Sequence, residues 1–600
     1  MPRSTLVASP EVIVDGSPVP TSDLAQISEL HVSRTLGAPS ELTLCLIDET
    51  FELLDGSRYV VGATIEVKFP DPTGKATSVF KGEVVSVGVD QHAGQARGCL
   101  LTLTALDLAH RLGHQTRVRT FQKQKYSDVV SRIASEYGLQ SQVDDTSISF
   151  DYLIQTTTDY AFLQELAFRT GYEWRVDDSK LIFKPRADSS PVVTVRYGED
   201  VRRIRARYTA GNEVAGVTVR AWNPLSKTAA VGTSQLSSVR GAGASGSASE
   251  LVTQGRNKAR AFSKDVASSS LLAAVPDEAT QLANALATRL ATADLSVRCE
   301  CLGDPRIAAG SVVKIENAGT KLSGNYYVTS VEHHFGRDGD LTTTFSTAPS
   351  DSSSIVDLLG GAERVNPFGQ LGLTIGVVTN NKDPDGHGRV RVKFPALSDS
   401  EESWWARIVT PGGGSEAGLM FMPQVDDEVL IGFEHGDMRR PYVLGGLWGA
   451  KAKPPTATDT FLANNKVIEW GVKTANKTTL TIRGGDKPED KHYKFALPDG
   501  TTHYMGSDKT EIIAQNKSIE LKSGQASIKI TDQGDIEIKG NNIKIEATQN
   551  LTVDGLQIAA KAKTSLKAEG SASLELKGGA SAKLEASGIT EIKGSLVKIQ

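Results

Sequence analysis

The residues that could do chemistry are few and widely spaced. Cys299 and Cys301 stand two apart in an alternating run, and neighbouring thiols are potential zinc ligands. No second Cys or His pair follows at a spacing that a zinc site needs. Alternation places both side chains on one face of a strand. We therefore interpret them as small core residues of that strand.

The histidines do not form a metal-binding pattern either. His333 and His334 are neighbours on a predicted strand, so they point to opposite faces and cannot chelate one ion together. We expect one to be buried and the other exposed. His387 and His435 lie in predicted turns, where a lone histidine is usually solvated.

Two further patterns have a possible chemical use. The run 241–246 matches G-x-G-x-x-G. However, no strand is predicted directly before it and no helix directly after it, so a dinucleotide site is not expected. Glu401 and Glu402 precede Trp404 and Trp405; paired carboxylates can do acid–base work, yet adjacent exposed acids in a polar loop are commoner. G-x-S-x-G, H-E-x-x-H and Walker A runs are absent. We predict no catalytic residue, no cofactor and no metal, and hence a chain that is not an enzyme.

The length and composition of the chain are those of an ordinary globular protein with several domains. It has 600 residues, 39% hydrophobic and 23% charged. With 66 basic and 71 acidic residues the net charge is −5, which does not suggest a nucleic-acid partner. The N-terminus lacks the apolar core of a signal peptide, and only four cysteines occur. We expect synthesis and assembly in the reducing cytoplasm.

The first 350 residues are predicted to be β-rich, with a small α/β insertion. Alternating runs at 41–46, 63–69, 81–88 and 100–105 predict the strands of a barrel or sandwich. Apolar residues at helical spacing predict helices over 126–137 and 160–170, ending at glycines, and a hairpin follows at 172–183. Strands return at 191–197, 216–222, 311–316 and 326–334, with a helix at 277–290 and a loop by composition at 240–250.

Residues 370–450 form a compact predicted unit. Strands at 373–378, 389–394, 403–409, 428–433 and 442–444 are short and closely spaced. Five or six such strands in about 80 residues fit a small closed barrel of the OB type.

The last segment is internally periodic. Apolar–polar–apolar units recur every seven to nine residues from Ile519 to Ile599, with Gly, Asn or Asp between many of them. One such unit cannot bury itself, but a stack can share a core. Either three successive units make one coil of a single-chain β-helix, or three chains each supply one strand per layer. The pattern also argues against a disordered Lys/Glu-rich tail.

These residues resemble a known family. The barrel motifs Asp383-Pro-Asp-Gly-His-Gly-Arg-Val-Arg-Val-Lys-Phe-Pro395 and Val425-Asp-Asp-Glu-Val-Leu-Ile-Gly-Phe433 resemble the OB domain of VgrG-type spike proteins of type VI secretion, contractile phage tails and extracellular injectors. The upstream runs 162–183 and 324–333 resemble the family's hub, and the repeats resemble its β-helical spike. The order of hub, OB domain and repeat segment along this chain resembles the order of these domains in the family, and the resemblance covers nearly the whole chain.

The resemblance implies a fold and a set of partners. It implies a mainly β chain with two β-barrel-like hub domains, an α/β insertion, an OB barrel and a triple-stranded intertwined β-helix, the needle of a homotrimer. It implies contacts with the inner tube protein, baseplate proteins, a PAAR-repeat tip protein, possible effector cargo and, transiently, a target membrane. The cap would bind the last residues, Val597, Lys598, Ile599 and Gln600. The particle would act inside the cell or be released from it.

Some features of the family are missing or left open. We expect no lysozyme insert, because residues 451–470 between barrel and needle are too few for one, and no toxin domain after the needle. No His lies near Gln600, so a His-x-His iron site is not expected either. The expected domains are hub barrel 1 at 1–115, insertion 116–190, hub barrel 2 at 191–350, linker 351–369, OB fold 370–450, linker 451–470 and spike 471–600.

Two other functions are alternatives to a structural spike. One is an adhesive or ligand-binding stalk that uses the OB barrel, and the other is a cell-wall-degrading spike enzyme.

Overall fold

The chain divides into two compact units, Met1–Pro454 and Pro455–Gln600. The computed structural model describes residues 9–91, 98–186, 190–208, 214–224, 226–235, 244–245, 266–269, 276–292, 295–347, 372–485, 487 and 490–599. The predicted linker 351–369 and most of the predicted loop 240–250 lie outside the described residues.

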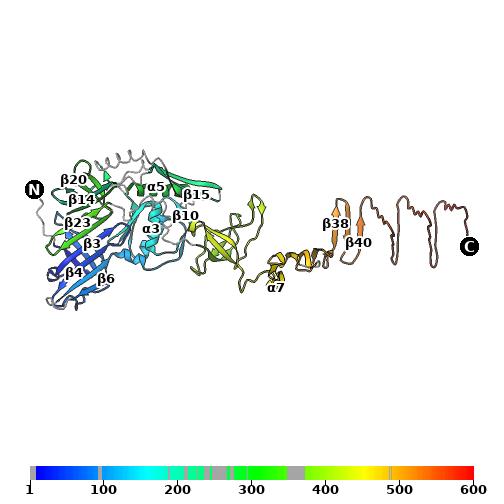
Figure 1. Ribbon diagram of the computed structural model, residues 1–600, viewed down its shortest axis with the longest axis horizontal. Helices are drawn as coiled ribbons and strands as arrows, with labels where there is room; N and C mark the ends of the chain where they lie inside the picture. The colour runs from blue at the N-terminus through cyan, green and yellow to red at the C-terminus, as the bar shows by residue number, and fades with distance from the viewer. Residues whose placement is uncertain are drawn as a thin grey trace. The chain divides into compact units, whose positions relative to one another are not determined.

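An eleven-stranded sheet is the largest feature of the first unit, and both predicted hub barrels contribute to it. Its order is β14-β19-β23-β22-β3-β4-β7-β6-β5-β1-β2. The two halves meet where β3 (Ile27–Thr35) pairs antiparallel with β22 (Ser330–Gly336), beside β4 and β23 in Figure 1. Its other strands are β1 (Glu11–Val14), β2 (Ser17–Pro18), β4 (Glu41–Asp48), β5 (Thr64–Pro70), β6 (Ala76–Asp90), β7 (Cys99–Leu106), β14 (Val201–Tyr208), β19 (Leu295–Leu302) and β23 (Leu341–Ser346).

Alternation along these strands builds the cores, as predicted. Leu42, Leu44 and Leu46 of β4 are buried while the residues between them are partly exposed. Cys299 and Cys301 of β19 lie in a second core with strands of the other half. The strands predicted at 41–46, 63–69, 81–88 and 100–105 are confirmed.

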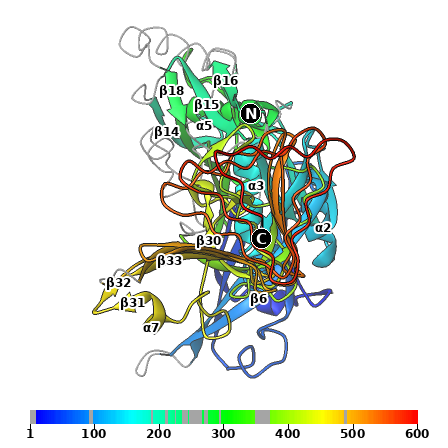
Figure 2. The ribbon, with the colours of Figure 1, turned by 90° about the vertical axis from the view of Figure 1, so that its right-hand side faces the viewer.

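Two smaller sheets and a long helix complete the hub. Helix α5 (Pro276–Thr292) packs on β15 (Gly216–Asn223) and β16 (Thr228–Gln235), as Figure 2 shows. The strand predicted over 326–334 is broken, because the chain leaves one sheet and enters another at Val328 and Thr329. The remaining elements are α1 (Thr21–Leu24), η1 (Leu108–Gly113), β13 (Val193–Arg196), β17 (Ala244–Ser245), β18 (Val266–Ser269), β20 (Val312–Glu316) and β21 (Gly324–Tyr327).

The insertion has its own core. Helices α2 (Tyr126–Glu136) and α3 (Asp159–Thr170) are confirmed where the apolar spacing predicted them. Gly138 and Gly171 follow them with φ of 68° and 73°, a conformation that favours glycine. The strands of the insertion are β8 (Arg119–Lys125), β9 (Gln140–Val143), β10 (Ser149–Gln155), β11 (Tyr172–Asp177) and β12 (Lys180–Pro185).

Residues 374–446 form the predicted small barrel, called here the OB domain. Its sheet has the order β25-β24-β29-β30-β26. The bridges Val390↔Ala406 and Lys393↔Glu402 join the segment around β25 to the one leading into β26, which closes the ring. Its elements are β24 (Thr374–Asn380), β25 (Arg391–Lys393), β26 (Arg407–Ile408), β27 (Gly413–Gly414), β28 (Ala417–Gly418), β29 (Glu428–Phe433), η3 (Glu434–Gly436) and β30 (Pro441–Gly446).

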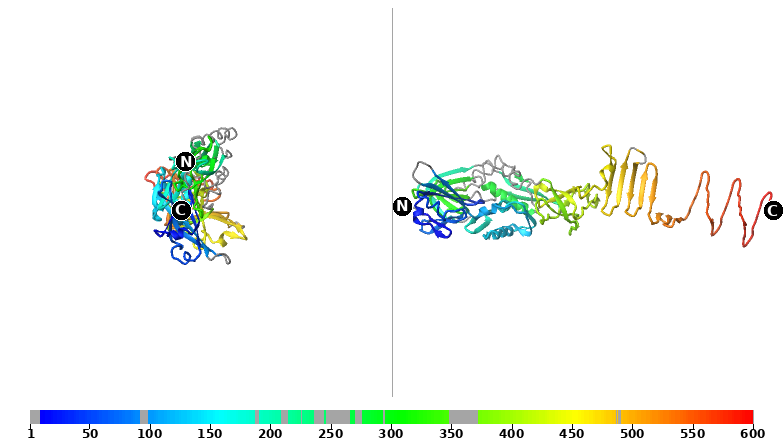
Figure 3. Two further views of the ribbon diagram at one scale, coloured as in Figure 1. Left: turned by 90° about the vertical axis from the view of Figure 1, so that its left-hand side faces the viewer. Right: turned by 90° about the horizontal axis from the view of Figure 1, so that it is seen from below.

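The second unit is a succession of short antiparallel strands. Two sheets, β33-β34-β35-β36-β37 and β38-β39-β40, keep chain order; Figure 3 shows the first as a row of adjacent strands. The structure places α7, β31, β32 and the start of β33 within the predicted linker 451–470. The elements are α7 (Thr458–Phe461), β31 (Leu462–Ala463), β32 (Lys466–Val467), β33 (Glu469–Lys473), β34 (Thr479–Gly484), β35 (Lys491–Ala496), β36 (Thr502–Gly506), β37 (Thr510–Ile513), β38 (Ile519–Ser523), β39 (Ala526–Ile530) and β40 (Ile536–Lys539).

Candidate functional site: the two-faced repeat segment

The register of β38, β39 and β40 gathers the apolar residues of the repeats on one face. Leu521 pairs with Ile528, which pairs with Ile538. A parallel row joins Ile519, Ile530 and Ile536. Because side chains alternate along a strand, both rows lie on the same side of the sheet. Leu521 is 59% exposed and Ile536 is 66% exposed, so this chain by itself leaves the face uncovered.

The opposite face of these strands carries the charges. Glu520 faces Lys529, which faces Glu537 on the next strand. Glu537 also receives a 2.8 Å contact from Lys539, two residues along, and this hydrogen bond lowers the pKa of the Glu537 carboxyl. Alternating acid and base across and along the strands makes this the solvated face.

The sheet β33–β37 repeats this arrangement with larger side chains. Its apolar face holds the rows Trp470–Ile482–Tyr493–Met505 and Val472–Leu480–Phe495–His503–Ile512. Trp470 is 56% exposed and Ile482 is 53% exposed. The repeat pattern missed these residues because their strands lack a fixed period, although the alternation in Thr479–Arg483 and Lys491–Phe495 could have identified them.

The remaining repeats are fully open. Within the described part of the segment, residues 540–599 form no strand that pairs inside this chain, and every one of them is exposed. Their apolar residues continue the series; Ile545 is 68% exposed and Leu576 is 84% exposed. Gly524 and Gly534 adopt φ of 57° and 90° at the turns between the preceding strands, as expected of turn glycines.

Such a face favours self-association. Burying an Ile or Leu side chain is worth about 1.5–3 kcal/mol, and contiguous apolar patches of this length are rare on monomeric proteins. The meander within β38–β40 does not coil back on itself, so the three-sided single-chain β-helix is not formed by these strands. Strands supplied by further copies would cover the apolar rows.

The predicted tip lies at the end of this series. Val597 is 49% exposed and Ile599 is 90% exposed; Lys598 is also exposed, and Gln600 lies outside the described residues. Their role in binding a cap stays a prediction.

The candidate histidines in the hub are confirmed as one buried and one exposed. His333 is 1% exposed and contacts the Thr343 hydroxyl at 3.0 Å and the Ile307 carbonyl at 3.2 Å. Burial, aided by the charge of Arg34, lowers the pKa of His333 to about 4. His334 lies 3.2 Å from Glu29 on the open face. Neither arrangement is that of a catalytic base with an oriented partner.

The cysteines are confirmed as core residues. Cys299 and Cys301 are fully buried. Burial raises the pKa of the Cys299 thiol to about 12, and it also raises the pKa of the Cys301 thiol well above its usual value. Both thiols therefore stay protonated, which makes them poor nucleophiles and poor metal ligands.

Glu401 and Glu402 are both half-buried, so the expectation of two simply exposed acids is wrong, although the Glu402 side chain itself keeps 42% of its surface exposed. Glu401 accepts a 2.5 Å hydrogen bond from the Thr120 hydroxyl of the insertion, and Glu402 accepts one through its carbonyl from Tyr152 at 2.8 Å. Trp404 stacks on Tyr152. The acids and the tryptophan thus belong to an internal contact between domains, which sequence spacing could not indicate.

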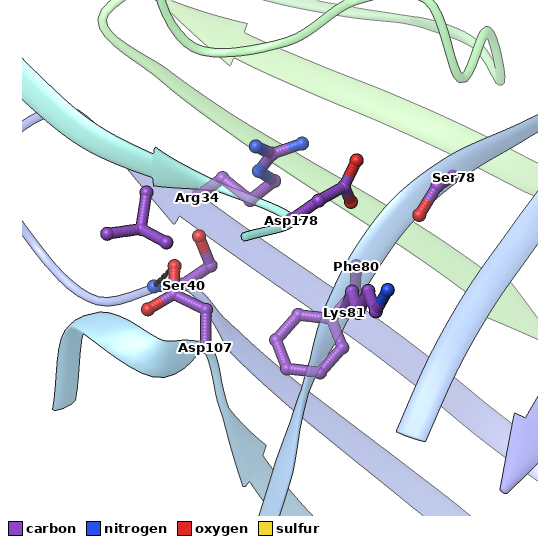
Figure 4. Close-up of a pocket in the computed structure, with 8 residues that line it drawn as sticks. Arg34, Ser40, Ser78, Phe80, Lys81, Asp107 and Asp178 are labelled. Carbon is purple, nitrogen blue, oxygen red and sulfur yellow. Dashed lines mark hydrogen bonds between the residues drawn. The ribbon is translucent and has the colours of Figure 1, made fainter. Parts of the chain in front are cut away.

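A small cavity lies between β6, β3 and the insertion. Arg34, Asp107 and Phe80 are among its lining residues (Figure 4). It measures about 20 Å³, which is room for one water molecule. Asp107 accepts the Ser40 backbone N–H there at 2.9 Å, and burial raises the pKa of the Asp107 carboxyl despite this bond.

The described helices are all too short or too polar to span a lipid bilayer.

Comparison with known proteins identifies related chains. The family described as "Alg8 N-terminal domain" matches residues 4–336, and "Type VI secretion system/phage-baseplate injector OB domain" matches residues 374–448. The type VI secretion system spike protein VgrG1b of Pseudomonas aeruginosa is 25% identical over 142 residues, which is 22% of this chain and 19% of that protein. The spike protein VgrG3 of Vibrio cholerae is 35% identical over 77 residues, 12% of this chain and 8% of that protein.

The chain thus spans less than a fifth of the length of these curated relatives. Among solved structures, a chain of the Francisella PdpA–VgrG complex is similar with a TM-score of 0.46 and 10% identity, over 89% of this chain and 88% of that one.

The first match covers more than half of the residues, and the second covers the barrel that closes around β24–β30. This chain belongs to the Alg8 N-terminal domain family, carries an injector OB domain, and is a relative of the VgrG-type spike proteins.

Proposed function

We propose that this chain is the central spike subunit of a contractile injection machine. Three copies would join a tube to a needle that pierces the target envelope. The observation that carries the proposal is the uncovered apolar face of β33–β40, in a chain that also holds an injector OB domain at residues 374–448. A subunit that cannot bury this face alone is built for a symmetric assembly.

A needle made in this way suits a mechanical task. Three chains that each add one strand per layer would place the apolar rows inside and the Glu–Lys face outside. The solvated face keeps the rod soluble, while the stacked core makes it stiff. Residues 540–599, which form no paired strand with any other described residues, would gain their strand partners from the other two copies.

The proposal names partners by their place in the assembly. The hub would contact the inner tube protein and baseplate proteins. A PAAR-repeat protein would bind the last layers at Val597, Lys598 and Ile599, with Gln600 beside them, and effector cargo would travel with it. Contact with the target membrane would be transient. We propose that the subunit is made and assembled in the cytoplasm, in a particle that acts there or is released.

The native mass of the purified chain tests the proposal. Light scattering should give about three times the 64.0 kDa of one chain. A truncation that ends at Lys517 removes β38–β40 and everything after them, and should weaken this association. A full-length chain that stays monomeric at micromolar concentration in both the presence and absence of salt would contradict a trimeric spike.

We further propose that the role is structural and not catalytic. The Glu401 carboxylate accepts a hydrogen bond from Thr120 of the insertion, and the Glu402 carboxylate lies 3.6 Å from Arg391 of the OB domain. If the purified chain released soluble fragments from peptidoglycan, the proposal that its role is not catalytic would be overturned. The stalk alternative also has a test: oligonucleotide binding at low salt would favour it, although Arg391 and Trp404 already stack within the chain.

A further inference from the structure

Among the described residues, the OB domain contacts the hub mainly at two places within the first unit. One lies between the OB turn at residues 434–440 and the start of α5, where Arg440 also donates to the Trp222 carbonyl of β15 at 3.1 Å, and the other lies between residues 401–404 and strands β8 and β10. Ile154 of β10 also packs against the OB core.

The first contact is a buried ion cluster drawn from three places in the chain. Arg439 donates to the Asp437 carboxylate at 2.8 Å and to the Glu278 carboxylate at 3.2 Å. Arg169 of α3 lies 3.6 Å from the same Glu278 oxygen, and the Tyr126 hydroxyl of α2 lies 3.4 Å from it. Glu278 is 1% exposed. Glu165 also pairs with Arg169 at 2.8 Å, so the cluster joins three acids and two bases.

The electrostatics agree with this geometry. Burial alone would raise the pKa of Asp437, but the charge of Arg439 outweighs it and lowers that pKa to about 2. Burial raises the pKa of Tyr126, and Glu278 adds to this effect, so the hydroxyl keeps its proton and can donate. Such a cluster is sensitive to loss of any member, because the remaining charges stay buried without a partner.

The second contact is a stack of flat side chains. Tyr152 of β10 stacks on Trp404 at a centroid distance of 5.9 Å. The guanidinium of Arg391, which lies in β25 of the OB domain, is 5.1 Å from the centroid of the same Trp404 ring. The Tyr152 hydroxyl donates to the Glu402 carbonyl at 2.8 Å. Aromatic and cation–π contacts of this kind add orientation to the apolar contact.

We propose that the α/β insertion and the first turn of α5 form a seat that locks the OB domain to the hub as one rigid body, with Glu278–Arg439 as its central contact. Arg439 reaches both Asp437 of its own turn and Glu278 of α5, so sliding the OB domain would leave Glu278 buried without this partner. The stack at Trp404 lies apart from the Glu278–Arg439 contact. It therefore opposes rotation of the OB domain about that contact. Together they would carry axial load between the two domains.

Hydrogen exchange on the full-length protein tests the lock. In Glu278→Gln, peptides covering residues 149–155, 276–282 and 434–440 should exchange at least about 10-fold faster, because the seat opens. Peptides covering β24 and β29 should keep their protection, since Asp437 and Arg439 still pair within the OB domain. Arg439→Met removes the contact from the other side and should accelerate the same peptides.

The matched control is Arg298→Met, which breaks the exposed Arg298–Glu332 pair on the hub sheet and should leave those peptides unchanged. Raising NaCl from 0.05 to 0.5 M should also leave them unchanged, because buried pairs are screened little. Unaltered exchange in both seat variants would overturn the proposal. So would loss of protection throughout β24 and β29 in Glu278→Gln, since the cluster would then hold the OB fold itself. The native mass of these variants reports separately on the spike assembly.

Discussion

His333 is a fully buried histidine of the hub whose pKa lies below its usual value because burial disfavours the charged ring. His333 lies in β22, next to the junction with β3, and its ring nitrogens contact Thr343 and the Ile307 carbonyl. A protonated ring would have to donate at both nitrogens, in a place that excludes water. The folded hub therefore resists protonation here, and its stability is linked to pH.

The hub should lose stability as the pH falls through the weakly acidic range. An unfolded histidine has a pKa of 6.5, whereas burial lowers that of folded His333 to about 4. Between these values the unfolded chain binds a proton that the folded chain does not. The free energy of unfolding should then fall by about 3 kcal/mol in total from pH 6.5 to 4, at about 1.4 kcal/mol per pKa unit.

Urea unfolding of wild type and His333→Gln at pH 7, 5.5 and 4.5 measures this contribution. Glutamine keeps a donor and an acceptor but does not titrate, so the variant should show the smaller pH dependence. His334→Gln, at the exposed neighbour, is the control and should behave as wild type. Equal pH slopes in all three proteins would show that His333 is not the linked group.

Helix α5 depends on close approach to its sheet at one glycine. A Cβ at Gly232 of β16 would lie 2.1 Å from the Ala279 carbonyl carbon of the helix backbone. Backbone cannot yield as a flexible side chain can, so the helix would have to move away from β15 and β16. The burial of Leu282 and Leu286 beneath it would be lost in part.

Gly232→Val should therefore destabilise the hub by roughly 1–3 kcal/mol or more. The measurement is the thermal unfolding midpoint by circular dichroism. Thr233→Val, on the exposed face of the same strand, is the matched control and should leave the midpoint nearly unchanged. Equal midpoints for both variants would mean that α5 does not pack as the structure describes.

The two faces of the β38–β40 sheet should differ in their tolerance of charge. Ile528→Glu places a carboxylate in the apolar rows, where an interface would have to bury it unpaired. We expect association between copies to weaken at least about 10-fold. Ser527→Glu puts the same charge beside Lys522 and Lys539 on the solvated face, and association should persist.

Sedimentation equilibrium of the two variants decides this prediction. An equal effect of both substitutions would indicate a general charge effect and not an apolar interface. A normal assembly of Ile528→Glu would show that copies do not meet through this face.

At the scale of the whole molecule, the two units differ in how they gain stability. The first unit holds five large cores of buried side chains from its own strands and helices. The second unit leaves its large apolar side chains exposed along β33–β40. The first therefore resembles a self-sufficient folded body, while the second depends on association.

A fragment ending at Pro454 should fold alone. We expect it to be monomeric or weakly associated, with a thermal transition that does not depend on protein concentration. The full chain should add a concentration-dependent transition from its second unit. Calorimetry at two concentrations separates the cases, and a fragment that fails to fold would show that the division at Pro454 is not a boundary of stability.

Periodicity in the sequence was enough to predict many of the strands, the main helices and the OB barrel, although it missed the strands β33–β37 and did not show the break at Val328 and Thr329. Alternation in β4 or the helical spacing of α2 depends only on neighbours within a few residues, and burial then selects the apolar face. The repeats from Ile519 likewise predict a two-faced strand series, and the buried Cys299 and Cys301 followed from the same rule.

Contacts between distant residues were decided only by the tertiary structure. The pairing of β3 with β22 joins the two hub halves into one sheet across almost 300 residues, and no local pattern encodes a partner at such a distance. Glu278 and Arg439 are 161 residues apart, and each looks like an ordinary surface charge in sequence. Glu401 was misjudged for the same reason, because its burial comes from a domain that folds against it. Periodicity determines which face of an element is buried, whereas the partner that buries it is chosen by packing of the whole chain.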